Sequence, residues 1–360
     1  MKQSVCFLLI CFFLWGCGQS DDSRRAPIAS SAADLGSQVS ELARDHEMSG
    51  VILVAVDGES VHEEAFNVEP LRTSFEITVD STFAIASITK SFTATLVLSQ
   101  VEMGRINLDA TIRNYLPAFN TAYADVVTVR QLLENRSGIP HYVDIPGWFE
   151  PDVVSGFTSE TFLAEIAELE LRFEPGEDYY YSNANYYLLG LILDAATGKT
   201  YEAVLQDTIL EPLGLEDVGQ IYAPGSQVVA PTYIRDGESY ELIKLGNPAL
   251  FRAAGSQFST ARDLVAFGQG LMRGAILGEE MRTVLLDEDR PMGFTVTSVS
   301  IADQEVPVIT YNGELAGTTT MLTIFPEQDG SIVILSNNNL PYAALVDMTL
   351  SIAQTAFGEH

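Results

Sequence analysis

A serine and a lysine stand three residues apart in the segment Ser87-Ile88-Thr89-Lys90, at the start of a long apolar stretch. In a helix, positions i and i+3 lie on one face, so the two side chains can meet. A serine hydroxyl becomes a nucleophile when a neighbouring base takes its proton, and an unprotonated lysine can be that base. Lys90 is one of four lysines in the chain, and it alone has a serine three residues before it. The pair predicts nucleophilic catalysis.

Four segments, in order, resemble the serine β-lactamase and penicillin-binding-protein superfamily, in particular its class C β-lactamase-like branch. Phe83–Lys90 contains the S-x-x-K signature of that superfamily. Tyr181-Ser182-Asn183 resembles the second motif in its tyrosine form, and the stretches 127–140 and 253–264 also match patterns of this branch. The similarity runs from about residue 40 to the end of the chain.

The resemblance implies a serine hydrolase that forms an acyl-enzyme and needs no cofactor. Ser87 would attack a carbonyl carbon, and Lys90 would accept its proton directly or through Tyr181. Tyr181 would pass a proton to the leaving group and later activate water, while Asn183 would position the substrate and the lysine head. By the same resemblance, the backbone N–H groups of Ser87 and Glu314 would hold the oxyanion.

Lys90 can act as a base near neutral pH only if its pKa falls well below the usual value of about 10.4. A shift of about three units costs about 4 kcal/mol of charge stabilisation. Burial against apolar neighbours can supply such a shift, whereas acids beyond a screening length of about 8 Å have little influence. We therefore expect Lys90 to lie in a dry site.

The third motif departs from the family pattern. The family usually has Lys-Thr-Gly or His-x-Gly on an edge strand, but this chain has Tyr311-Asn312-Gly313. A cation there would pair with the carboxylate of a penicillin or a D-alanyl peptide, whereas Tyr311 can only hydrogen-bond. We therefore favour an ester or neutral amide substrate, with Gly313 leaving room for it. A D-alanyl-D-alanine carboxypeptidase, a D-amino-acid peptidase and a β-lactamase remain as alternatives.

The same residues also have structural interpretations. Ser87 and Lys90 could be a helix cap and a lysine with a packed stem, Tyr179–Tyr181 could be aromatic core, and Tyr311 could pack within its strand. The altered third motif also allows a catalytically silent binding protein of the cell envelope. Loss of ester hydrolysis in Ser87→Ala would separate an enzyme from such a protein.

Other catalytic and cofactor motifs are missing from the sequence. It contains no G-x-S-x-G elbow, G-x-G-x-x-G loop, Walker loop or HExxH motif. The four histidines have no mutual metal spacing, and His141 is interpreted as a loop residue near the cleft. We therefore expect no metal.

The first residues resemble a bacterial lipoprotein signal. A basic start at Lys2 precedes an apolar run of 11 residues, Val5–Trp15, which is shorter than the roughly 20 residues of a membrane-spanning helix. We expect residues 1–16 to be a signal peptide, Cys17 to be lipidated and residues 17–33 to form a tether. The chain would then be anchored in the bacterial cell envelope, in the outer membrane facing the periplasm if the source is Gram-negative.

The charge of the chain limits its partners. The sequence has 49 acidic and 19 basic residues, a formal net charge of −30. Such a surface repels nucleic-acid phosphates and anionic membrane surfaces. We expect a small ester, amide or peptide as substrate, contact with the membrane only through the lipid on Cys17, and no nucleic acid.

Strand patterns flank a helical middle. Strands are expected at 51–56, 61–66, 293–300, 306–311, 319–325 and 331–336, and helices at 34–47, from about Ser87 to Met103, after a cap at Ser259 or Thr260, and at 345–357. The prediction is an α/β (α+β) catalytic domain over 34–360. One antiparallel sheet would come from 34–90 and 251–360, flanked by helices, and 91–250 would form a mostly helical inserted subdomain.

Overall fold

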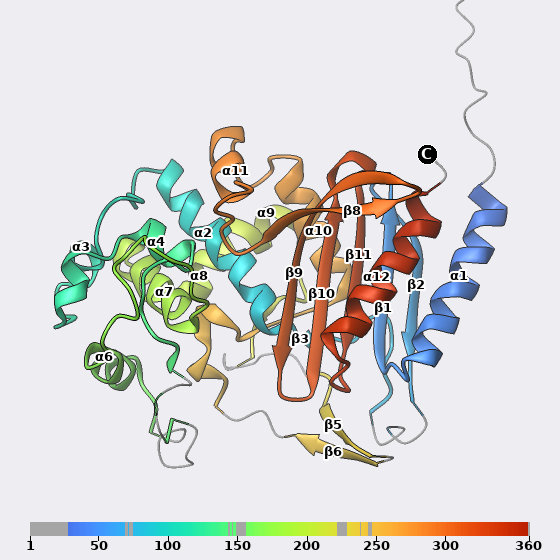
Figure 1. Ribbon diagram of the computed structural model, residues 1–360, viewed down its shortest axis with the longest axis horizontal. Helices are drawn as coiled ribbons and strands as arrows, with labels where there is room; N and C mark the ends of the chain where they lie inside the picture. The colour runs from blue at the N-terminus through green and yellow to red at the C-terminus, as the bar shows by residue number, and fades with distance from the viewer. Residues whose placement is uncertain are drawn as a thin grey trace, which may run out of the picture.

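A computed structural model of the chain describes residues 28–68, 71, 75–142, 145, 147–148, 156–221, 229–237, 239–243 and 247–358. The predicted signal peptide and Cys17 lie outside these residues. A six-stranded antiparallel sheet stands beside a mostly helical region (Figure 1). In spatial order the strands are β2 (Glu59–Phe66), β1 (Gly50–Val56), β11 (Gly330–Ser336), β10 (Thr318–Phe325), β9 (Gln304–Leu315) and β8 (Thr295–Ile301). The prediction of one sheet built from both chain ends is confirmed.

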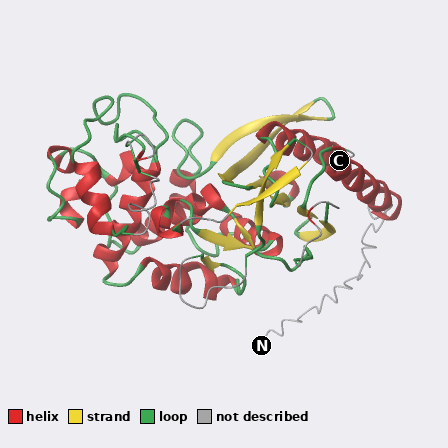
Figure 2. Ribbon diagram, turned by 90° about the horizontal axis from the view of Figure 1, so that it is seen from below, coloured by secondary structure: helices red, strands yellow, loops and turns green. Residues whose placement is uncertain are grey.

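Both faces of the sheet are buried, which explains the continuous apolar run of β1. Successive side chains of a strand point to opposite faces, so Val51 and Leu53 enter one core and Ile52 and Val54 the other. Helices α1 (Ile28–Asp45) and α12 (Tyr342–Phe357) cover the second face (Figure 2). Each fully buried side chain of this kind contributes about 1.5–3 kcal/mol.

Helices α2 (Thr89–Glu102) and α10 (Ala261–Met272) belong to the core on the other face. The rings of Phe92 in α2 and Phe267 in α10 stack with their centroids 3.8 Å apart. Every residue of α2 from Thr89 to Gln100 is buried. Because α2 is enclosed on all sides, residues at its start are held rigidly at the junction of the sheet and the helical region.

The helical region surrounds α7, the helix Asn183–Thr197, which is largely buried and ends at Gly198 in a left-handed conformation. The other helical segments are α3 (Ile112–Tyr115), η3 (Ala122–Asp125), α4 (Val129–Leu133), α6 (Ser159–Ala167), α8 (Tyr201–Leu205), the π-helical turn η5 (Gln206–Leu210), α9 (Glu211–Leu213), η6 (Pro248–Leu250), η7 (Arg252–Ala254) and, later in the chain, α11 (Glu279–Leu285) and η8 (Pro326–Gln328). Helix α7 packs against both α2 and η7, which brings its first residues beside the start of α2.

Short strands join distant segments near α2. β3 (Phe83–Ala84) pairs with β7 (Gln257–Ser259), which also pairs with β4 (Gly219–Gln220). This pairing brings the 3-10 turn η7 beside the start of α2. The hairpin of β5 (Thr232–Asp236) and β6 (Ser239–Ile243) was not among the predicted strands.

Most predicted boundaries lie within three residues of the observed ones, and the larger differences are the start of α1 and the end of β9, which runs to Leu315 instead of Tyr311. Helix α1 begins at Ile28, so it includes the last six residues of the predicted tether, 28–33. That stretch is rich in alanine, which favours helix. Helix α2 begins at Thr89, after a 3-10 turn over Ala86–Ile88, instead of at Ser87. The predicted cap at Thr260 is confirmed, because its hydroxyl accepts from the Asp263 N–H.

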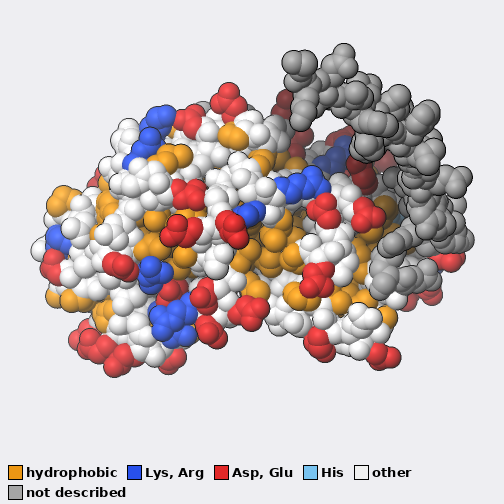
Figure 3. All heavy atoms as spheres, turned by 90° about the horizontal axis from the view of Figure 1, so that it is seen from above, with side chains coloured by type: hydrophobic (Ala, Val, Ile, Leu, Met, Phe, Trp, Pro, Cys, Tyr) orange, Lys and Arg blue, Asp and Glu red, His pale blue; other side chains and the backbone are white. Residues whose placement is uncertain are grey.

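The surface carries acidic side chains over much of the face shown in Figure 3, with basic ones between them. This agrees with a solubilising distribution of charge rather than one acidic patch. Among the described helices, none is long and apolar enough to cross a membrane.

Candidate active site

Ser87 lies in the turn η2 (Ala86–Ile88), between β3 and α2. The preceding residue, Ala86, has a φ of +47°, a conformation that costs a residue with a side chain about 1–3 kcal/mol. The turn is pressed against β9 at Gly313, where an added Cβ would lie 2.2 Å from the Ile85 carbonyl oxygen. Gly313 is therefore required for the close approach of β9 to the turn, a reason that adds to the predicted need for substrate space.

Lys90 meets Ser87 across one helical turn, as the spacing predicted. Its Nζ lies 3.1 Å from the Ser87 Oγ and donates to the Ala254 carbonyl oxygen at 2.6 Å. The side chain is fully buried. The rings of Tyr181 and Tyr186 lie nearby, with centroids 4.9 and 5.6 Å from Nζ. The predicted dry surroundings of Lys90 are confirmed.

Burial holds the pKa of Lys90 well below its usual range, because the charged ammonium loses its hydration inside the protein. Among the ion pairs of the described residues, none involves Lys90, so no carboxylate restores the charged form. A neutral amine has a lone pair with which to accept the proton of Ser87. The electrostatics of the site therefore favour Lys90 as a base.

Tyr181 lies on the other side of the nucleophile. Its hydroxyl is 2.8 Å from the Ser87 Oγ. Burial, partly offset by the hydrogen bond to Ser87, raises the pKa of Tyr181 to about 12. Tyr181 therefore keeps its proton at neutral pH, so it is suited to donate a proton, whereas Lys90 is the better acceptor.

The segment Tyr181-Ser182-Asn183 is held by a buried polar network. Asn135, at a φ of +54°, accepts from the Ser182 N–H and from the Asn185 side chain through its Oδ1, at 3.1 and 2.9 Å. The Ser182 hydroxyl caps α7 and donates to the Pro140 carbonyl. These contacts place Tyr181 and Asn183 at the amino end of α7.

Asn183 is the first residue of α7, and its side chain hydrogen-bonds that of Tyr142, while its buried Oδ1 accepts no hydrogen bond from the described residues. A buried acceptor of this kind is available to a substrate N–H. The described hydrogen bonds of Lys90 go to Ser87 and Ala254, so the predicted contact between Asn183 and the lysine head is not among them.

The third-motif residues lie on β9 beyond its last pair with β8, Thr310 with Thr295. Tyr311 pairs with Leu322 of β10 and shares the face of the sheet that carries the core around α2. Its side chain hydrogen-bonds that of Tyr181, and burial raises its pKa well above the usual range. Tyr311 therefore lies in the site as an uncharged phenol.

The side chain of Glu314 lies on the opposite face of β9 from that of Tyr311. Glu314 shares its face with Asn312, two residues earlier, and Asn312 pairs with Met321 of β10. Met321 belongs to the core beneath α1 and α12. Because side chains alternate along a strand, the Glu314 side chain is directed to that face and away from Ser87. Its backbone N–H is the group that can serve the site, as the resemblance implied.

Sequence reasoning missed the Ala254 carbonyl and Tyr186. The stretch around Ala254 was noticed, but a backbone acceptor leaves no mark in the residue type. Tyr186 lies in α7, five residues after Tyr181, and a tyrosine at this position of a buried helix is indistinguishable in the sequence from an ordinary core residue. His141 borders the site, with its ring centroid 6.2 Å from that of Tyr181.

The described residues form no metal cluster, and one surface hollow lies away from the site. In the described part of the chain, no three His, Cys, Asp or Glu side chains are grouped to hold a metal ion. A surface hollow of about 490 Å³ lies at the β2 edge of the sheet, between α1 and β2, and is lined by residues such as Arg44, Glu64 and Phe66. It is separate from Ser87, which lies beside β9.

Comparison with known families gives one match along most of the chain. The profile described as Beta-lactamase matches residues 36–357. The curated protein Penicillin-binding protein 4* of Bacillus subtilis is 24% identical over 330 residues, which cover 82% of this chain and 69% of that protein. Esterase EstB of Burkholderia gladioli is 29% identical over 58% of this chain and 56% of its own length.

Solved structures with this fold include enzymes of D-amino acid chemistry. The D-amino acid amidase of Ochrobactrum anthropi, complexed with D-phenylalanine, superposes with a TM-score of 0.78 over 91% of this chain and 100% of that chain, at 22% identity. A penicillin binding protein from Bacillus halodurans superposes with a TM-score of 0.74 over 87% of this chain and 98% of that one, at 21% identity. At these identities the likeness concerns the fold.

Proposed function

The chain belongs to the Beta-lactamase family, and on that basis we propose that it is a serine hydrolase whose Ser87 forms an acyl-enzyme. The observation that carries this proposal is that Ser87 contacts both Lys90 and Tyr181. Lys90 is buried and has no carboxylate partner among the described residues, and Tyr181 is protonated. A base and an acid are thus each within hydrogen-bond distance of the nucleophile.

In acylation, the Ser87 Oγ forms a bond to the substrate carbonyl carbon while its proton passes to the Lys90 Nζ. The oxygen of the carbonyl becomes an oxyanion, which the N–H groups of Ser87 and Glu314 would hold. Tyr181 gives its proton to the leaving alcohol or amine as that bond breaks. The Lys90 ammonium then gives its extra proton to the Tyr181 oxygen, which leaves both residues neutral in the acyl-enzyme.

Deacylation runs through the same groups in reverse. A water molecule gives its proton to the Tyr181–Lys90 pair and attacks the acyl carbon. The Ser87 oxygen leaves and regains a proton from Lys90, so the free enzyme is restored with both residues in their starting states.

We propose an ester or a neutral amide as the substrate. Tyr311 occupies the position of the usual cation, and as a buried phenol it offers a hydrogen bond but no charge for a substrate carboxylate. The similarity to an esterase agrees with this class. The shared fold of a D-amino acid amidase, and the unpartnered acceptor on Asn183, keep a D-amino-acid amide as the second candidate.

The test is hydrolysis of a panel of p-nitrophenyl esters, D- and L-amino acid amides and a penicillin by the protein truncated before residue 28. Ser87→Ala should abolish turnover of every substrate, while Ser99→Ala, a buried serine on the same helix, should retain it. Intact-mass spectrometry after brief penicillin exposure would show whether Ser87 also carries a β-lactam adduct. Wild-type protein without turnover or adduct would instead support the silent binding protein.

We also propose that Cys17 carries a lipid that anchors the enzyme in the bacterial cell envelope. The support is the sequence from Met1 to Cys17, which resembles a lipoprotein signal. Metabolic labelling with an alkyne fatty acid should mark the wild type but not Cys17→Ala. Equal labelling of both proteins would contradict the anchor.

A further inference from the structure

Behind Lys90 lies a second chain of hydrogen bonds that the chemistry above does not use. The Gln257 Nε2 lies 3.1 Å from the Tyr201 hydroxyl, which lies 2.8 Å from the Thr93 Oγ1. The Thr93 Oγ1 in turn lies 2.7 Å from the Ala253 carbonyl oxygen. The side chains of Gln257, Tyr201 and Thr93 are all fully buried, so bulk water does not compete for these hydrogen bonds.

The chemistry of the two ends favours one direction for this chain, and the Thr93 Oγ1 is nearer to the Ala253 carbonyl oxygen, at 2.7 Å, than to the Thr89 carbonyl oxygen of its own helix, at 3.1 Å. An amide NH₂ can only donate and a carbonyl oxygen can only accept. With Gln257 donating to Tyr201, the Tyr201 O–H is free to donate to Thr93, and the Thr93 O–H donates to Ala253. Burial raises the pKa of Tyr201, which keeps its phenol proton in place. Aligned bonds of this kind strengthen one another.

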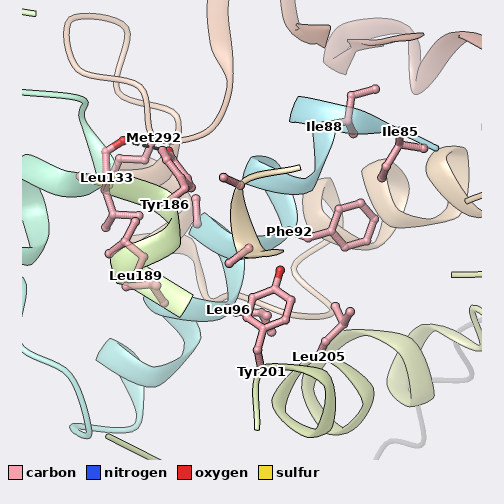
Figure 4. Packing of buried hydrophobic residues seen from close by; sticks show 14 of the residues in the cluster. Ile85, Ile88, Phe92, Leu96, Leu133, Tyr186, Leu189, Tyr201, Leu205 and Met292 are labelled. Atoms are coloured by element: carbon pink, nitrogen blue, oxygen red, sulfur yellow. Dashed lines mark hydrogen bonds between the residues drawn. The ribbon is translucent and has the colours of Figure 1, made fainter. Parts of the chain in front are cut away.

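The chain ends one peptide away from the acceptor of Lys90. Ala253 and Ala254 are consecutive residues of the turn η7, and their carbonyls both reach α2. Thr93 holds the first carbonyl and Lys90 holds the second, one helical turn apart on α2. Figure 4 shows Tyr201 near Leu96 and Phe92 of α2, the helix that also carries its hydrogen-bond partner Thr93.

We propose that Thr93 and Tyr201 are positioning residues that hold the Ala253–Ala254 peptide so that the lone pair of Lys90 faces Ser87. This inference rests on the proposed role of Lys90 as the base. A neutral lysine has two N–H bonds and one lone pair. Anchoring one N–H on the Ala254 carbonyl, 2.6 Å away, restricts rotation of the amine and leaves the lone pair directed to the Ser87 hydroxyl, 3.1 Å away.

We call the hydrogen-bonded side chains of Thr93 and Tyr201, with the Ala253–Ala254 peptide that they hold, the clamp. The proposal predicts two effects on the rate when the clamp is loosened. The Ala254 carbonyl favours the ammonium form, so weakening that contact lowers the pKa of Lys90 further and moves the acid limb of the rate profile to lower pH. At the same time the plateau rate falls, because the lone pair is less well aligned. A variant that merely loosened packing would admit water and move the limb to higher pH. The ionisable groups shown near Lys90 are Tyr181, just before α7, and Tyr186 of α7. The elements packed against α2 also carry Tyr201 of α8 and Arg252 of η7, which pairs with Asp194, and Tyr311 of β9 contacts Tyr181.

The test is the pH dependence of Ser87 labelling by an alkyl fluorophosphonate, which needs no knowledge of the substrate. The Ser87 oxygen bonds to phosphorus, fluoride leaves, and the hydroxyl proton passes to Lys90. Thr93→Val and Tyr201→Phe interrupt the clamp, while Thr93→Ser retains its hydroxyl. The controls are Thr95→Val, a buried threonine of α2 bonded to the Ser91 carbonyl, and Tyr123→Phe, a buried tyrosine bonded to the Ile166 carbonyl.

We expect Thr93→Val and Tyr201→Phe to lower the plateau labelling rate about tenfold or more and to move the limb to lower pH. Thr93→Ser and both controls should resemble the wild type. If the wild type is labelled at Ser87 but Tyr201→Phe keeps its rate and limb, the clamp is disproved and the proposed function stands. If the wild type is not labelled, the proposed nucleophile fails first. Tyr201→Phe changes only a hydroxyl, so it keeps the test decisive should Thr93→Val not fold.

Discussion

The Nζ of Lys90 lies 3.1 Å from the Ser87 Oγ, and the lysine is buried without a carboxylate partner among the described residues. Both facts are needed for catalysis. Proximity alone would place an ammonium beside the nucleophile, and an ammonium cannot accept a proton. Burial alone would give a neutral amine with nothing to deprotonate. The fold supplies both by placing Ser87 in the turn η2 and Lys90 in the first turn of the buried helix α2 that follows it.

Replacing Lys90 by methionine should abolish the base while keeping an unbranched side chain in the same space. Because general-base catalysis typically contributes about 10²–10⁴-fold, we expect kcat/KM on the preferred ester to fall by that order. Because burial lowers the pKa of Lys90, the wild-type rate should rise with pH well below the ordinary titration range of a lysine, and this limb should be missing in Lys90→Met. A wild-type profile without such a limb would contradict a neutral lysine base.

Tyr181→Phe tests the acid. The variant keeps the ring near Lys90 but loses the hydroxyl 2.8 Å from the Ser87 Oγ, so protonation of the leaving group should slow by about 10²-fold or more. Tyr186→Phe is the matched control, because the Tyr186 hydroxyl donates to the Leu133 carbonyl and its ring also lies near Lys90. Single-turnover kinetics with a poor and a good leaving group measure the effect. Equal loss for both leaving groups would count against Tyr181 as the acid.

Several of these relationships were readable from the sequence. The helical spacing of Ser87 and Lys90 predicts their contact, and the continuous apolar run of β1 predicts a strand buried on both faces. The pairing of both chain ends in one sheet follows from the succession of strand patterns. These features are local or periodic, so the residue types record them.

Other relationships depend on packing between distant segments. The Ala254 carbonyl reaches Lys90 only because β7 pairs with β3, and a backbone oxygen has no signature in the sequence. The contact of Tyr311 with Tyr181 joins β9 to the start of α7 and depends on register. The β5–β6 hairpin escaped prediction because its strands are largely exposed and carry no strong apolar alternation.

Gly313→Ala should both destabilise the protein and impair the site. Its Cβ would lie 2.2 Å from the Ile85 oxygen, so β9 or the nucleophile turn must move, at a cost of about 1–3 kcal/mol.

Gly36→Ala is the matched control for the Gly313→Ala substitution, and it should have the opposite effect on stability. Gly36 lies within α1, and its added Cβ would make ordinary contact with His62 at 3.4 Å, so we expect a gain of about 0.5–1 kcal/mol. Urea unfolding of both variants measures the difference; a stable, active Gly313→Ala would contradict the close approach.

Asp263 should make the protein less stable as the pH rises from 5 to 7. Burial raises its pKa to about 6 in the folded state, above the usual value of about 3.9. The folded state then binds more protons than the unfolded state between these values, so this contribution is present at low pH and lost through about pH 6. Asp263→Asn should flatten the dependence of Tm on pH, and Asp287→Asn, at an exposed turn, should not. An unchanged slope in Asp263→Asn would contradict the assignment.

Tyr311→Lys should shift the preference of the enzyme toward substrates that carry a carboxylate. The position lies beside Tyr181 on the part of β9 that β8 leaves unpaired, so an ammonium there can meet a carboxylate next to the scissile bond. We expect kcat/KM for a penicillin or a D-alanyl peptide, relative to its methyl ester, to rise about tenfold, the value of one modest charge-assisted contact. Tyr311→Phe controls for loss of the hydroxyl and should leave the ratio unchanged. A ratio unchanged in Tyr311→Lys as well would mean that another residue sets the selectivity against carboxylates, because the added charge would then lie out of reach of the substrate.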